Sequence, residues 1–319
     1  MDFTAITGSR VFQLLKATFD DWMEDNALRL SAALAYYSVF SIAPLLIIAI
    51  SIAGLVLGEE AVRGQLYHQL GAYVGPQAAA SVQSMVQSAS KPSDGWMGAV
   101  VGFATLLLGA AGFFAQLKDA LNTIWEVQAK GGAGIWGFVR ARLLNFGMVL
   151  VIGFLLLTTL LLTTALAALS GYFESVVGMP AFLGAVLGFA ISFAVVTMLF
   201  ALIFKVLPDA QIAWRNVWIG AAVTALLFEL GKFGLSFYLG RESTASSFGA
   251  AGAVVLLLLW VYYASCILLF GAEFTQVYAR ESGHAIVPAP GAAAVTEESR
   301  AQQGMAPAGG SKIAESSRL

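Results

Sequence analysis

The sequence predicts an all-α integral membrane protein: a six-helix transmembrane bundle with an N-terminal amphipathic helix and a helical outer loop. Of the 319 residues, 59% are apolar and 11% are charged, whereas a soluble domain carries about 25% charged residues. The mean hydropathy is +0.80. Six stretches each supply the roughly 20 mostly apolar residues that a spanning helix needs, and none shows the alternating polarity of barrel strands. This composition excludes a water-soluble globule.

An amphipathic helix is predicted over residues 10–24, within a cytoplasmic segment 1–30. Its apolar face consists of aromatic and aliphatic residues at helical spacing, namely Phe12, Leu15, Phe19 and Trp22. Charged residues fall elsewhere on the helix. Two interpretations stay open: the helix lies on the membrane surface, or it packs on the protein's own cytoplasmic loops.

The membrane domain is predicted to cover residues 31–280. Its six spans are expected at about 31–58, 96–117, 143–171, 180–204, 213–239 and 248–273. Pro44 lies inside the first span and removes one helix hydrogen bond, which predicts a kink. The fifth span is less apolar than the others, because Glu229 and Lys232 interrupt its second half.

Three segments outside the spans have distinct compositions. Residues 59–95, the longest connection, are compatible with a small helical cap. Residues 116–127 favour a polar helix that either gates a pore or presents a solvated face. Residues 281–319 are rich in Ala, Gly, Pro, Ser and Glu without apolar periodicity, which predicts a disordered cytoplasmic tail.

The distribution of positive charge predicts the orientation. With six spans, thirteen Lys and Arg fall on the face that carries both termini and three on the opposite face. Under the positive-inside rule this bias places both termini in the cytoplasm of a multi-pass protein of the bacterial inner, or plasma, membrane.

Glu229 and Lys232 are the sharpest candidates for a functional site. They are three residues apart and therefore share one face of the fifth helix. Ionisable groups inside a span cost roughly 2.5–3.5 kcal/mol each and usually face a bundle interior or a water-filled cavity. One interpretation is a substrate or ion pathway, to which Pro44 and Glu273 are added. The other is an ion pair that only offsets its own desolvation, or a Lys232 that snorkels to the interface.

The remaining candidates concern partners. Arg140 and Arg142 precede the third span and are expected to contact lipid phosphates. Membrane lipids are the expected partners, with an anionic lipid or small molecule as substrate.

Gly-x-x-x-Gly pairs in the second and fourth spans are compatible with a homo-oligomer. The net charge of −2 argues against nucleic acid. The sequence carries no metal-ligand cluster, no cofactor motif and no common catalytic signature, so we expect neither a cofactor nor an enzyme.

Four motifs in order give this chain a family resemblance: ALAYYSVFSIAPLL at 33–46, ALNTIWEV at 120–127, LPDAQIAWRNVWIGAAVTALLFELGKFGLSFYL at 207–239 and LLLLWVYYASCILLFGAEFTQVYA at 256–279. Together they resemble the YihY/BrkB family of bacterial inner-membrane proteins over about residues 25–280. The matching positions are Tyr36, Pro44, Asn122, Trp125, Pro208, Trp214, Gly220, Glu229, Tyr238, Trp260, Gly271 and Glu273. The resemblance implies six membrane helices and, in one branch of the family, lipid transport. Some members carry the name ribonuclease BN, which this sequence does not support.

Two hypotheses about function follow. The first is a transporter or lipid translocase that uses the charged site in the fifth helix. The alternative is a non-transporting structural or assembly protein of the cell envelope. Substitutions at Glu229 and Lys232 discriminate between them, because only the first hypothesis predicts loss of function with normal insertion.

Overall fold

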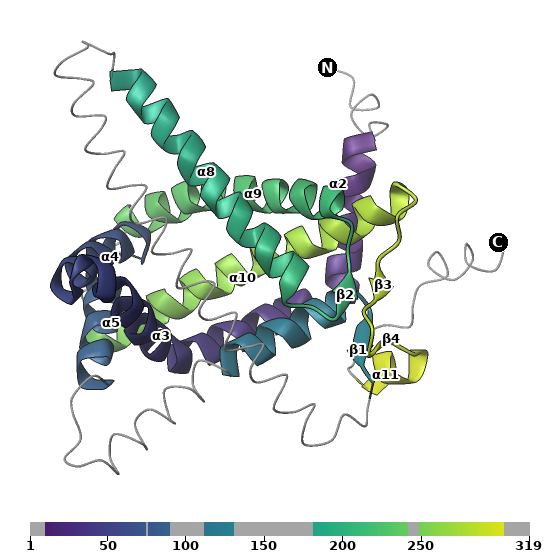
Figure 1. The fold of residues 1–319 in the computed structure, drawn as a ribbon, viewed down its shortest axis with the longest axis horizontal. Helices are drawn as coiled ribbons and strands as arrows, with labels where there is room; N and C mark the ends of the chain where they lie inside the picture. The colour runs from purple at the N-terminus through teal and green to yellow at the C-terminus, as the bar shows by residue number, and fades with distance from the viewer. Residues whose placement is uncertain (1–9, 75, 90–111, 131–180, 242–248, 303–319) are drawn as a thin grey trace.

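The computed structural model describes residues 10–74, 76–89, 112–130, 181–241 and 249–302, and these are almost entirely helical (Figure 1). The helices are α2 (Arg10–Glu24), α3 (Ala27–Leu57), α4 (Glu59–Val74), α5 (Pro76–Ala89), α8 (Ala181–Val206), α9 (Trp214–Arg241), α10 (Gly249–Glu281) and the short α11 (Glu297–Gln302). A further helix covers residues 112–124.

Four of the six predicted spans coincide with long helices, namely α3, α8, α9 and α10. The end of the second overlaps the helix over residues 112–124. Residues 96–111 of the second span and the whole third span, 143–171, lie outside the described residues. The largest difference is at α10, which continues to Glu281, eight residues beyond the predicted end, because its last turns bury Phe274 and Val277 against α2 and α9.

Within the described residues, two helices are long and apolar enough to cross a membrane by length and composition, Phe189–Val206 and Val254–Glu281. Only 28% and 22% of the residues in their most apolar windows are buried inside the protein. A core helix of a soluble protein would be mostly buried, so their exposed apolar surface is what a lipid-facing helix presents.

The helices form a bundle with two different ends (Figure 1). α10 is central, since it packs against both α3 and α9, while α8 packs on α9. The hairpin of α4 and α5 lies at one end. The opposite end carries α2, the short strands and α11, so the described segments nearest to the two chain termini share one end of the bundle (Figure 1).

A reciprocal small-residue contact sets the crossing of α9 and α10. A methyl group built on Gly220 of α9 would overlap the Thr275 hydroxyl of α10, and one built on Gly271 of α10 would overlap the Thr224 hydroxyl of α9. Each threonine Oγ1 donates a hydrogen bond to the carbonyl oxygen four residues earlier on its own helix, at 2.7 Å in both cases. Two Gly-x-x-x-Thr patterns therefore interlock, and the helices approach closely while both threonine hydroxyls stay hydrogen-bonded.

The prediction of a disordered tail is wrong for residues 287–302. Strand β3 (Val287–Pro288) pairs antiparallel with β2 (Ala210–Gln211), and β4 (Ala292–Ala294) pairs antiparallel with β1 (Val127–Ala129). Composition misled because the tail does not fold on a core of its own. Its strands instead hydrogen-bond to two short strands elsewhere in the chain. β1 follows the helix over 112–124, and β2 follows α8.

One buried arginine holds this tail segment in place. Arg300 of α11 is 2% exposed and pairs through Nη2 with Asp25 Oδ1 at 3.2 Å and through Nη1 with Glu126 Oε1 at 2.5 Å. Asp25 follows α2, and Glu126 ends the helix over 112–124 in a left-handed conformation with φ of 53°. Three distant parts of the sequence thus meet at one guanidinium.

The helix predicted over residues 10–24 is confirmed as α2, but its apolar residues face two ways. Leu14 and Trp22 are buried, and Trp22 packs edge-on against Phe270 of α10 at 6.3 Å between ring centroids. Phe12, Leu15 and Phe19 are exposed. The helix therefore packs on the protein with one side and leaves an apolar strip uncovered on the other.

We expect Gly220→Ala to lower the thermal unfolding midpoint of the detergent-purified protein. Overpacking a tight contact costs about 1–3 kcal/mol, and the Thr275 side chain has no free direction while it bonds its own helix. Gly234→Ala on the same helix is the matched control, because nothing lies within 4 Å of its added methyl group. Equal midpoints for the two variants in scanning fluorimetry would contradict the interlocked crossing.

We expect Arg300→Met to release the tail from the bundle. Removing one partner of a buried ion pair costs about 3–5 kcal/mol, and 1.4 kcal/mol corresponds to a factor of ten. The Ala292 N–H donates to the Ala289 carbonyl and the Val295 N–H to the Glu126 carbonyl. Amide hydrogen exchange at both positions should accelerate at least tenfold. Arg215→Met, at an exposed position, should leave the exchange unchanged; unchanged exchange in Arg300→Met as well would show that the ion pairs do not hold the tail.

Candidate functional site

Glu229 and Lys232 form an ion pair on α9, as their spacing predicts. Lys232 Nζ lies 2.5 Å from Glu229 Oε2, and the exposed fractions of the two side chains are 21% and 4%. The second carboxylate oxygen, Oε1, is buried and has no hydrogen-bond partner. The pair therefore leaves one acceptor unsatisfied, which in a buried position costs free energy.

The pair lies deep within the helix. Glu229 is about 22 Å along α9 from its first residue, Trp214, and about 18 Å from its last, Arg241. Glu229 is buried, whereas Leu226 and Leu230 on either side of it along the helix are exposed. The carboxylate is thus buried inside the bundle, while Leu226 and Leu230 are exposed on the outside.

Glu273 does not join this pair. It is fully buried on α10, between Gly271 and Thr275, which oppose Thr224 and Gly220 of α9. That level is about two helical turns from Glu229 along α9. Glu273 therefore lies at the helix crossing near the end of the bundle that carries α2, separate from the Glu229–Lys232 pair.

The other predicted site residues are placed only in part. Pro44 lies within α3, which stays helical on both sides of it; its side chain is outside what the structure describes, and the kink stays a prediction. Arg140 and Arg142 lie outside the described residues. Their predicted contact with lipid phosphates is therefore also still a prediction.

Residues 116–127 do not form the solvated face that is one of the two roles predicted for them. Asn122 Oδ1 accepts a hydrogen bond from the Asp209 N–H at 2.8 Å, and its Nδ2 donates to Asp209 Oδ2 at 3.1 Å. Lys118 Nζ also pairs with Asp209, at 2.8 Å. Trp125 is buried and donates from Nε1 to the Ala272 carbonyl at 3.2 Å. These residues join the helix to the α8–α9 connection and to α10, so the segment is not a solvated face. The gate stays a prediction.

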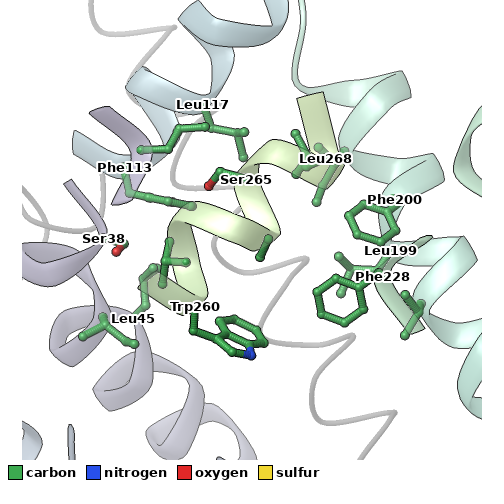
Figure 2. A pocket seen from close by; sticks show the side chains of 16 residues that line it. Ser38, Leu45, Phe113, Leu117, Leu199, Phe200, Phe228, Trp260, Ser265 and Leu268 are labelled. Carbon is green, nitrogen blue, oxygen red and sulfur yellow. The ribbon is translucent and has the colours of Figure 1, made fainter. Parts of the chain in front are cut away.

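An apolar cavity of about 360 Å³ lies between α3, the helix over 112–124, α8, α9 and α10 (Figure 2). Phe113 and Leu117 face it from one side, Phe200 and Phe228 from another, and Trp260 closes a third (Figure 2). Phe228 directly precedes Glu229, so the charged pair shares a helical turn with the cavity wall. Sequence reasoning missed this cavity, because single apolar residues on five segments give no local signal.

No group of three or more potential metal ligands occurs in the described ranges. Many charged side chains of the described residues form ion pairs. Each pair links two secondary-structure elements or two neighbouring turns of one helix. Their geometry suits binding and packing.

Comparison with known proteins identifies one family of membrane proteins. Residues 18–296 match the family described as virulence factor BrkB. Similar curated proteins are each named UPF0761 membrane protein: one from Alcanivorax borkumensis is 29% identical over 83% of this chain, one from a Psychrobacter species is 27% identical over 83%, and one from Alteromonas mediterranea is 28% identical over 79%. No solved structure matches.

The relatives differ from this chain in length. The match spans 59% of the Alcanivorax protein and 48% of the Psychrobacter protein, but 83% of the Alteromonas protein. The chain thus covers roughly half to four fifths of these relatives. Their names give a membrane location and no activity.

We expect Lys232→Met to destabilise the protein more than Glu229→Gln. The first change leaves an almost fully buried carboxylate without its counter-ion, which is costly. The second leaves a partly exposed lysine that can extend toward a polar region. Thermal unfolding midpoints of the two variants in detergent test this order, and the double variant should recover part of the loss. A Lys232→Met midpoint equal to that of wild type would show that the pair contributes nothing to stability.

Proposed function

We propose that this chain, which belongs to the virulence factor BrkB family of membrane proteins, is a transporter of the bacterial inner membrane, with lipid translocation as its activity. The observation that carries the proposal is the Glu229–Lys232 pair, in which the carboxylate is buried with one oxygen, Oε1, unsatisfied and the lysine is partly exposed. The unused acceptor leaves the pair able to bind a further hydrogen-bond donor, which a ligand can supply.

The pair has the chemistry to recognise a polar head group. Lys232 offers a cation to a phosphate or carboxylate, and Glu229 Oε1 accepts a hydrogen bond from a hydroxyl or ammonium group. A zwitterionic or hydroxylated anionic head group supplies both. Binding such a group would exchange the internal ion pair for two contacts with the substrate, so the site would not pass through a state with an isolated buried charge.

The two ends of the bundle suit an asymmetric membrane position. In this proposal α2 lies in the cytoplasmic interface with its exposed Phe12, Leu15 and Phe19 among lipids, and both termini are cytoplasmic. The α4–α5 hairpin then faces the exterior. The share of Lys and Arg on the predicted inner face supports this orientation.

Purified protein reconstituted in vesicles of phosphatidylethanolamine and phosphatidylglycerol tests the activity. A fluorescent phosphatidylglycerol with the label on its acyl chain is reduced by dithionite only in the outer leaflet, so transfer between leaflets is measured directly. We expect transfer above that of protein-free vesicles, and at least a tenfold lower rate for Glu229→Gln.

Glu60→Gln is the matched control, because Glu60 is exposed in α4, away from the pair, and should transfer lipid at the wild-type rate. The assay is repeated with labelled phosphatidylethanolamine, whose head group is zwitterionic. If correctly folded wild type transfers neither labelled lipid faster than protein-free vesicles do, lipid translocation is rejected and the non-transporting envelope role is favoured. Equal transfer by wild type and Glu229→Gln would retain the activity but remove the pair from it.

A further inference from the structure

We infer that the apolar cavity beside Trp260 is a binding site for a single lipid acyl chain. This inference requires the membrane location but not transport, and it therefore stands apart from the proposed function. Its basis is the volume, the lining and the position of the cavity in the bundle.

The cavity has the size of a ligand site. A volume of about 360 Å³ falls in the range of such sites, about 300–1,000 Å³. The cavity is partly open rather than an enclosed void, so a ligand can enter it.

The lining rejects water and polar ligands. A buried water needs two to four polar partners, and the cavity wall is formed almost wholly by aliphatic and aromatic side chains. Its hydroxyl groups are those of Ser38 and Ser265 (Figure 2), and the Ser38 hydroxyl is already used, because it donates to the Ala35 carbonyl at 2.7 Å. An occupant must be apolar along its whole length.

Three aromatic rings form much of the cavity wall. The Phe228 ring contacts the rings of both Phe200 and Trp260 in edge-to-face geometry. The centroid distances are 5.9 Å to Phe200 and 6.0 Å to Trp260. These three rings come from α8, α9 and α10, and their contacts join two sides of the cavity (Figure 2). In a membrane protein the abundant apolar molecule of extended shape is the acyl chain of a lipid.

Filling the cavity tests the inference. Ala264 lines it on α10, so Ala264→Phe should occupy the volume that the chain would take. Ala190→Phe is the matched control, because Ala190 is exposed on α8 and the same substitution there adds bulk outside the cavity. Thermal unfolding of both variants verifies that they fold.

The probe is a phosphatidylethanolamine with a photoactivatable diazirine in its acyl chain, mixed into vesicles that contain the full-length protein. After irradiation, we expect adducts on buried lining residues such as Leu117 and Phe200, and at least a fivefold loss of these adducts in Ala264→Phe but not in Ala190→Phe. Adducts confined to exposed side chains, or equal labelling of Leu117 and Phe200 in both folded variants, would overturn the inference. Because the readout is labelling, its outcome is independent of the transfer rate.

Discussion

The close crossing of α9 and α10 is the contact on which the rest of the structure depends. Gly220 and Gly271 admit the threonine of the opposite helix, and any side chain at either position would push the two helices apart. In lipid, such packing replaces the hydrophobic effect as the force between helices. The crossing brings Trp125 to the Ala272 carbonyl and fixes the side of α9 on which Glu229 is buried. α10 is thereby held between α3 and α9, with the cavity beside it.

The two ends of the bundle are built by different means. Around the α9–α10 crossing, buried charges and backbone pairing join parts distant in sequence: Arg300 links the tail to Asp25 and Glu126, and Asp209 gathers Lys118 and Asn122. Deeper in the bundle the described contacts are mostly apolar, and the Glu229–Lys232 pair lies there. Binding at this pair would involve side chains other than those that Arg300 and Asp209 hold.

Much of the fold could be predicted from the sequence, because long apolar runs and helical periodicity are local signals. α3, α8, α9 and α10 appear where their composition predicts them, and α2 follows from its spacing. The spacing of Glu229 and Lys232 also predicted their contact. The ordered tail, the role of Asn122 and the cavity could not be predicted, because each depends on residues that are distant in sequence. Arg300 gave one usable signal: it is an arginine in a tail rich in small residues, for which an acidic partner elsewhere could have been sought.

Native mass spectrometry of the detergent-purified full chain, wild type beside Glu229→Gln, tests the central claim that the charged pair recognises a ligand. The account predicts that wild type retains a lipid population enriched in one head-group mass. The variant should retain lipids in the proportions of the surrounding membrane, because its acyl-chain cavity is intact while its head-group site is not. Identical lipid spectra for the two proteins would contradict the account and reduce the pair to a structural contact.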